Sequence, residues 1–415
     1  MPEAVLLAAP PDRDRLGLRT AVVAMFLASA GIPLYIHLPM FAAEIGLPLA
    51  TVGIVLLGIR VMDFVQDPFL GWLAQRLPDR RGQLAALSLL ALGGGLMWVF
   101  ALQPGLFGFV LGLILVFTAY SLGMILFYSQ CVANAAAGGD TEHYRLAGWR
   151  ETGMLIGIVV AAILPQVGGD LLGARGGYVL LGAVALLAAP LVIRAGAPLW
   201  QGPVPVQTEV SYRQLLSGRA RHLLVLSLVN ALPVAVTATL FLFFVDDKLG
   251  LPDLAGVFLV MFFVAAGATA PLWSRLAAHF GPRRVLLVAM VLAIAAFGGT
   301  AMLPPGAAVA FGLITIASGA ALGAEMVILP AFFSATLASA DLPAALGFGA
   351  WNFANKFALA LAAGILLPTL HLAGYTPGGA NSAAVLALLT AAYALLPLFL
   401  KLPAIWLVLR LTDEV

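Results

Sequence analysis

The segment "GIRVMDFVQDPFLGWLAQR", residues 58–76, places charged side chains inside an otherwise apolar stretch. On an α-helix each residue advances by about 100°, so Arg60, Asp63, Asp67 and Gly71 fall within one arc of about 80°. An ionised group at the centre of a bilayer costs about 2.5–3.5 kcal/mol, and such groups therefore face protein or water. The segment predicts a membrane-spanning helix whose charged face is turned towards the protein interior.

The composition of the whole chain is that of a membrane protein. Of its 415 residues, 62% are hydrophobic and only 10% are charged, whereas soluble domains carry about 25% charged residues. The uncharged run 82–139 is more than twice as long as the roughly 20 residues that one helical span needs. These features predict a chain that crosses the bilayer many times.

Breaks at proline, glycine and charge clusters predict an all-α membrane protein with twelve transmembrane helices in two six-helix bundles. The longest polar connection follows the sixth span, so we expect an N-terminal bundle at 1–195, a cytoplasmic linker at 196–220 and a C-terminal bundle at 221–415. The predicted spans are 18–43, 50–76, 84–103, 106–134, 144–167, 177–195, 221–246, 253–278, 284–303, 307–338, 344–370 and 383–409.

An internal repeat supports the division into halves. The segments "GWLAQRLPDRRGQ" (71–83) and "PLWSRLAAHFGPRRVLL" (271–287) each join an apolar helix end containing tryptophan to a tight turn with two arginines. Parallel repeats of this kind are typical of the major facilitator architecture. The alternative is two independent cytoplasmic loops that both follow the positive-inside rule.

Arginine is concentrated in the first residues and in the loops after even-numbered spans, whereas the opposite loops hold only Arg175 and Lys248. The positive-inside rule then predicts that both termini are cytoplasmic, and residues 1–16 are expected to be a cytosolic lead-in without signal-peptide layout. The net charge of +2 gives no reason to expect nucleic-acid binding. The chain has no catalytic motif, so we expect neither an enzyme nor a cofactor.

Asp63 and Asp67 are the strongest candidates for chemistry. Pro68 lacks an amide hydrogen and frees the carbonyl of Phe64 one turn earlier, which adds a third hard oxygen. Such a cluster is suited to bind Na⁺ as a metal site, or to bind H⁺ as a proton acceptor. In the alternative interpretation Arg60 neutralises one acid and the charges only brace helices, but one arginine cannot neutralise two acids.

The motif R-x-x-D-x-x-x-D-P-x-x-G at residues 60–71 resembles the second-helix motif of the glycoside–pentoside–hexuronide:cation symporters, the melibiose permease type of the major facilitator superfamily. The resemblance implies that Asp63 and Asp67 hold the coupling cation. It places Gln66 where the family selects its ion and suggests Ser121 as a further ligand.

Three other segments resemble this family more weakly: "LFYSQCVAN" (126–134), "LAGWRETGMLIG" (146–157) and "WNFANKFALALAAG" (351–364). They imply that Tyr128, Arg150 and Lys356 contact the substrate. Trp351 and Asn352 are expected to join them, because Asn352 and Lys356 lie one turn apart on one helix face.

Two other intramembrane acids need partners. Glu151 follows Arg150 directly, and since neighbours on a helix point about 100° apart, the two need not pair. Glu325 lies in mid-span without a nearby base, so we expect Lys356 or Arg150 to reach it. It is a candidate proton carrier, and the alternative is a permanently paired or neutral acid.

The chain also departs from the family pattern. The first span, "AVVAMFLASAGIPLYIHLPMF" (21–41), has no acid. Met124 stands where the family has a substrate-binding aspartate, and Thr336 stands near another position that is acidic in the family.

We predict that the protein is a monomer in a bacterial inner membrane. Its expected activity is cation-coupled symport of a small polar solute, such as a sugar or glycoside, by alternating access. The alternatives are a lipid or amphiphile transporter or drug exporter of the same fold, and a non-transporting membrane receptor or assembly factor.

Overall fold

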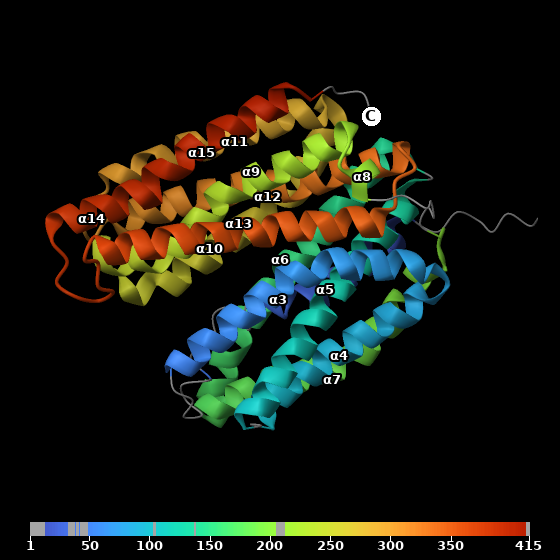
Figure 1. Cartoon of the computed structure of the whole chain (residues 1–415), viewed down its shortest axis with the longest axis horizontal. Coiled ribbons are helices and arrows are strands. Elements are labelled where there is room, and N and C mark those ends of the chain that lie inside the picture. Colours follow the sequence, from blue (N-terminus) through green and yellow to red (C-terminus); the bar gives the residue numbers. More distant parts are fainter. Residues whose placement is uncertain are drawn as a thin grey trace, which may run out of the picture.

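The computed structural model describes residues 13–31, 38, 41, 49–102, 105–136, 138–204 and 212–411, and the regular secondary structure in these ranges is helical (Figure 1). The long helices of the first half are α1 (Arg13–Ala28), α3 (Leu49–Arg76), α4 (Arg81–Ala101), α5 (Leu106–Ala136), α6 (Asp140–Leu172) and α7 (Ala174–Gly196). Those of the second half are α9 (Gly218–Phe243), α10 (Ala255–Phe280), α11 (Pro282–Gly298), α12 (Ala308–Ser339), α13 (Ala344–Leu372), α14 (Ala383–Thr390) and α15 (Leu396–Leu409).

Short elements connect or extend these helices. Single turns stand at η2 (Pro78–Arg80), η3 (Ala197–Gln201), η5 (Pro252–Leu254), η6 (Gly299–Met302) and α8 (Tyr212–Leu215). Two wider π-turns, η4 (Phe244–Lys248) and η7 (Ala391–Leu395), continue α9 and join α14 to α15.

The helices follow the predicted spans closely, because helix length is set by the apolar run that must cross the bilayer. Among the described residues, ten helical stretches are long and apolar enough to span a membrane. Parts of the first predicted span, 18–43, and several side chains of α3 lie outside the described residues, so the count of twelve stays a prediction. The all-α membrane class is confirmed.

Figure 1 shows the helices of the two halves as two groups, with α3 to α7 in one and α9 to α15 in the other. Helices α3 and α13 run side by side where the groups meet, and α6 packs against α10 in the same way. In Figure 1, α3 and α13 diverge towards the side on which α14 lies. The bounds 1–195, 196–220 and 221–415 stay a prediction.

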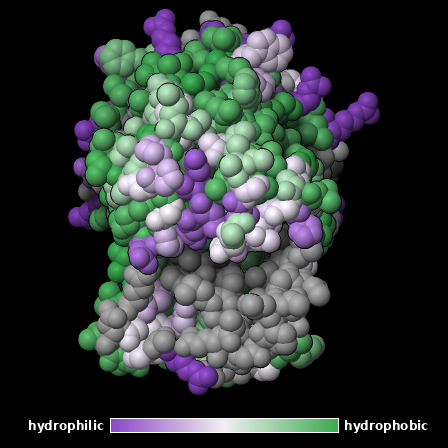
Figure 2. Space-filling model, turned by 90° about the vertical axis from the view of Figure 1, so that its left-hand side faces the viewer, coloured by the Kyte–Doolittle hydropathy of each residue, from purple (hydrophilic) through white to green (hydrophobic). Residues whose placement is uncertain are grey.

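Large apolar side chains lie exposed along the helices. Phe107 is 82% exposed, Leu187 69% and Phe399 67%. Figure 2 shows hydrophobic side chains over much of the surface, with hydrophilic ones near the middle of the face in view and others projecting around its rim. Apolar surface on this scale is explained by contact with lipid, and the protein is therefore an integral membrane protein.

Candidate functional site

Helices α3 and α13 touch through two glycines. A Cβ atom added to Gly71 would lie 2.7 Å from the carbonyl oxygen of Ala345, and one added to Gly349 would lie 2.8 Å from that of Asp67. Only glycine lets the two backbones approach so closely. The helices are antiparallel, so Asp63 and Asp67, which precede Gly71, lie on the same side of the crossing as Lys356, which follows Gly349.

Lys356 extends from α13 into the acidic face of α3. Its Nζ atom donates hydrogen bonds to Asp63 Oδ1 at 2.7 Å, to Asp67 Oδ1 at 3.1 Å and to Ser121 Oγ at 2.7 Å. It also lies 2.9 Å from Asp67 Oδ2. The resemblance implied that Lys356 contacts substrate, but the structure places it among the predicted cation ligands, because the crossing of α3 and α13 brings it there.

The charges of the described side chains in this cluster do not balance. Two carboxylates face one ammonium group, and the Asp63 and Asp67 residues are only 4% and 0% exposed. Within the described residues, Asp67 Oδ2 lies in the ion pair with Lys356 but accepts no hydrogen bond. Arg60 belongs to α3, but its side chain lies outside the described residues. The described side chains thus leave one buried negative charge, whose burial costs free energy unless a cation or proton compensates it.

Helix α5 completes the cluster with hydroxyl groups. Ser121 Oγ donates to Asp63 Oδ1 at 2.9 Å, and Gln66 Nε2 donates to the same oxygen at 3.3 Å. Thr118 Oγ1 donates to Gln66 Oε1 at 2.9 Å. Carboxylate and hydroxyl oxygens of this kind suit a small hard cation. Sequence reasoning missed Thr118, although it stands one turn before Ser121 on the same helix face.

A second buried cluster joins α5 to α6. Arg150 Nε donates to Glu151 Oε1 at 2.8 Å, and the guanidinium carbon lies 4.0 Å from the centre of the Tyr128 ring. Tyr128 Oη donates to Glu151 Oε1 at 3.3 Å. The neighbours do pair, because their long side chains fold around the helix to meet. The Arg150 Nη2 atom is buried and donates to no described residue.

A third cluster lies within the second group of helices. Lys401 Nζ on α15 lies 2.5 Å from Glu325 Oε1 on α12. Asn230 on α9 donates to Glu325 Oε2 at 2.8 Å and accepts from Lys401 Nζ at 2.8 Å. The expectation that Lys356 or Arg150 pairs with Glu325 is wrong, because Lys401 on α15 forms this ion pair.

The two other predicted substrate residues lie on α13. Trp351 is 7% exposed and stacks on Phe333 with ring centres 4.9 Å apart. Asn352 is half-buried one turn before Lys356. Phe348, one turn before Asn352, lies 4.7 Å from the Tyr128 ring centre. The aromatic side chains of α5, α12 and α13 thus pack together beside the second cluster.

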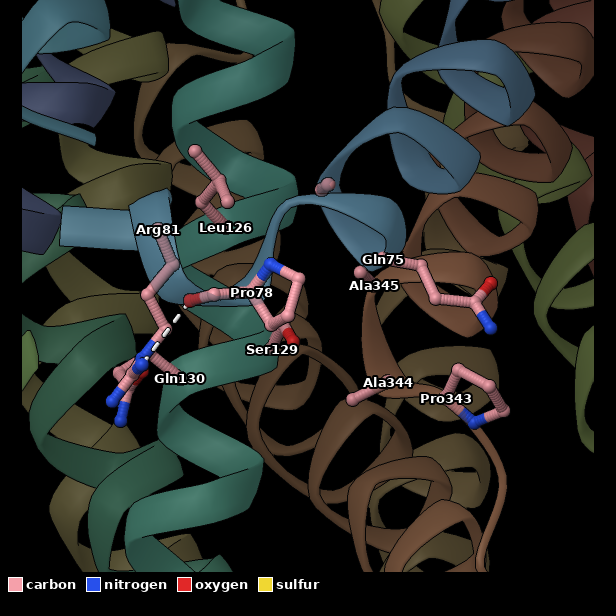
Figure 3. A pocket seen from close by; sticks show the side chains of 10 residues that line it. Gln75, Pro78, Arg81, Leu126, Ser129, Gln130, Pro343, Ala344 and Ala345 are labelled. Carbon is pink, nitrogen blue, oxygen red and sulfur yellow. Dashed lines mark hydrogen bonds between the residues drawn. The ribbon is translucent and has the colours of Figure 1, made fainter. Parts of the chain in front are cut away.

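A small hollow beyond the crossing has a structural arginine at its edge. It is lined by Gln75, Pro78, Ser129, Pro343 and neighbouring residues, and Figure 3 shows Arg81 and Gln130 at its edge. Arg81 donates to Gln130 Oε1 at 2.8 Å and to the carbonyl oxygens of Trp200 at 3.0 Å and Gly202 at 2.9 Å. Arg81 is therefore committed to joining α4, α5 and η3.

Two groups of membrane helices that meet at a polar cluster are the architecture expected of the major facilitator class of transporters. The chain matches the family described as MFS/sugar transport protein over residues 19–412. It belongs to this family, whose members are membrane transporters and not enzymes. The family resemblance of the sequence is thereby confirmed.

Relatives and solved structures agree with this assignment. The inner membrane symporter YicJ of Escherichia coli (strain K12) is 26% identical over 248 residues, which cover 55% of this chain and 53% of that protein. The match thus spans about half the length of this relative. The E. coli fucose:proton symporter FucP superposes with a TM-score of 0.65 at 15% identity, covering 93% of this chain and 97% of that one.

A bacterial homologue of the iron transporter ferroportin, solved in an outward-facing state, has a TM-score of 0.69 at 15% identity. The superposition covers 96% of this chain and 98% of that one. At this level of identity the likeness shows the shared fold.

Proposed function

We propose that this protein is a cation-coupled symporter of a small polar solute, such as a sugar or glycoside, and that Asp63 and Asp67 hold the coupling Na⁺ or H⁺. The observation that carries the proposal is the unbalanced cluster of two aspartates and one lysine between the two groups of helices. The names of YicJ, an inner membrane symporter, and FucP, a fucose:proton symporter, support it.

Lys356 acts in this proposal as a tethered cation. In the described state its ammonium group joins α13 to α3. A Na⁺ or H⁺ that binds beside Asp67 Oδ2 neutralises the surplus charge and competes with Lys356 for the carboxylates. The position of α13 relative to α3 therefore becomes sensitive to the ion, and coupling to substrate is the reciprocal effect of each ligand on the affinity for the other.

The substrate is proposed to bind beside Tyr128, Arg150, Trp351 and Asn352. The buried Arg150 Nη2 has no acceptor among the described residues, and a substrate hydroxyl oxygen would supply one. Asn352 adds a donor and an acceptor from the opposite group of helices. Aromatic faces beside polar groups suit the mixed surface of a sugar.

The orientation is also a proposal. Contacts between the groups gather near the arginine-rich loops: His143 Nδ1 lies 2.7 Å from Ser334 Oγ, and Ser274 Oγ donates to the carbonyl oxygen of Tyr144 at 2.6 Å. If these loops and both termini are cytoplasmic, as the positive-inside rule predicts, the described state is closed towards the cytoplasm of a bacterial cell.

The test is ion-driven uptake of labelled monosaccharides and glycosides into proteoliposomes, with an imposed Na⁺ or H⁺ gradient. We expect at least one solute to accumulate, and Asp67→Asn to reduce its accumulation about 100-fold. Asp253→Asn, the same chemical change at an exposed position, serves as the matched control. Undiminished gradient-driven uptake by Asp67→Asn would overturn the assignment of the cation site.

A further inference from the structure

A groove between two helices of the first group combines basic and apolar side chains. It lies between α1 and α7, which pack against each other. It does not involve the α3–α13 crossing and is independent of the proposed function. Its lining consists of Leu18, Arg19, Val22, Leu191, Arg194, Ala195 and Pro198.

The two arginines in this groove are available to a ligand. Arg194 is exposed and Arg19 is half-buried. Neither forms a salt bridge or a side-chain hydrogen bond with any other residue in the described part of the chain, unlike Arg145 and Arg150, which both pair with glutamates. Arg19 lies near the start of α1 and Arg194 near the end of α7, so both guanidinium groups stand at the same membrane boundary.

The apolar lining continues from the arginines into the membrane. Val22 follows Arg19 by about one turn along α1, and Leu191 precedes Arg194 by about one turn along α7. Because α1 enters the bilayer at this end and α7 leaves it, both apolar residues lie deeper than the arginines. Leu191 is 69% exposed and Leu18 is 57% exposed, which leaves an apolar surface free for a hydrocarbon chain.

We infer that this groove is a binding site for an anionic phospholipid. The phosphate lies between Arg19 and Arg194, and one acyl chain lies along Val22 and Leu191. Paired basic groups between transmembrane helices recognise anionic lipid head groups. Each contributes about as much binding free energy as a basic residue does near an anionic membrane surface. A bound lipid would join α1 to α7 and stabilise the first group of helices.

The experiment is native mass spectrometry of the purified full-length protein titrated with phosphatidylglycerol. Phosphatidylcholine with the same acyl chains tests the charge requirement, and glycerol 1-phosphate tests the head group without chains. We expect phosphatidylglycerol to bind in preference to both. The variant Arg19→Gln/Arg194→Gln is expected to bind it about 30-fold more weakly, which corresponds to about 2 kcal/mol.

The matched control is Arg80→Gln/Arg221→Gln, which removes the same charge from two exposed arginines outside the groove and should leave binding unchanged. Leu191→Gln should weaken phosphatidylglycerol binding while both arginines remain. Thermal unfolding gives a second readout, since the lipid should raise the Tm of the wild type and not that of the double arginine variant. Equal binding of phosphatidylcholine, binding of glycerol 1-phosphate as tight as that of the lipid, or unchanged binding by the double variant would overturn the inference.

Discussion

The two lysine–carboxylate clusters of this protein differ in charge balance and in the helices that they join. Lys356 connects α13 to α3 across the two groups of helices and faces two aspartates. Lys401 connects α15 to α12 inside one group, faces only Glu325, and shares Asn230 with it. Among the described side chains, the first cluster is unbalanced and spans the two groups of helices, whereas the second is balanced and lies within one group.

This difference indicates which charges are sensitive to a rearrangement of the two groups of helices. A pair that stays inside one group keeps its partners when the groups rearrange, so its electrostatic energy changes little. A pair that spans the groups gains or loses energy with every rearrangement, and an ion that binds one arrangement better shifts the equilibrium. In the proposed function, the Glu325 cluster therefore holds its own group of helices together, and the Asp67 cluster is the one that responds to the ion.

The largest effect is expected from breaking the balanced cluster. Glu325→Gln leaves Lys401 buried without a counter-charge and should lower the free energy of unfolding by about 3–5 kcal/mol. Glu325→Met/Lys401→Met removes both charges and should restore most of this stability, with ion-driven uptake retained. Unfolding in detergent and proteoliposome uptake measure the two effects. Loss of pH-dependent uptake in the stable double variant would instead support a proton-carrying role for Glu325.

Removing the lysine of the unbalanced cluster should lower the free energy of unfolding, and a bound cation should restore it. Lys356→Gln leaves Asp63 and Asp67 facing each other and should destabilise the protein by about 2–3 kcal/mol in the absence of a coupling ion. Since a ligand at 100 times its Kd contributes about 2.7 kcal/mol, saturating Na⁺ or acid should restore most of the loss. Lys401→Gln is the matched comparison: acid should also rescue it, by protonating the Glu325 carboxylate that the substitution leaves without a counter-charge, but Na⁺ should not. Equal responses of the two variants to Na⁺ would remove the distinction between the clusters.

The glycine crossing offers a way to weaken only the cluster that spans the groups. Gly349→Ala places a methyl group 2.8 Å from the carbonyl oxygen of Asp67, and relief of such a clash costs about 1–3 kcal/mol. We expect α13 to separate from α3. In a Cys131→Ser background, a cysteine introduced by Ser129→Cys, in the hollow beyond the crossing, should react about tenfold faster with a thiol reagent.

The control for this experiment is Gly364→Ala, on the same helix, where an added Cβ atom meets nothing within 4 Å. It should leave the reactivity of the introduced cysteine unchanged. Equal acceleration by both alanine variants would mean that the crossing does not hold the groups together.

The smallest effect is expected at the hydrogen bond between α6 and α12. Ser334→Ala removes the partner of His143 Nδ1, and a buried hydrogen bond contributes about 0.5–1.5 kcal/mol. The same cysteine reporter should react a few-fold faster. Ser339→Ala, whose hydroxyl bonds only to a carbonyl of its own helix among the described residues, should have no effect, and an identical response would show that His143 does not help to close this end.

Much of the fold is predicted by the sequence. The apolar runs predict the ends of α4 to α13 to within about five residues, apart from the short α8, because the thickness of the bilayer sets the length of each helix. The last predicted span, 383–409, is divided in the structure into α14, the π-turn η7 and α15. The spacing of Asp63 and Asp67 also predicts that they share a face, since helical geometry is local. Lys401 was missed, although a lysine inside an apolar segment is itself a signal of a buried partner.

The partners of these charges required the tertiary structure. The sequence by itself determined that the protein is a helical membrane protein and that α3 carries two acids on one face, because hydropathy and helical periodicity act over a few residues. Only the packing of α13 on α3, through Gly71 and Gly349, decided that Lys356 supplies a cation to Asp63 and Asp67. Such pairing depends on which helices lie side by side, and the local pattern of a single helix contains no information about its neighbours.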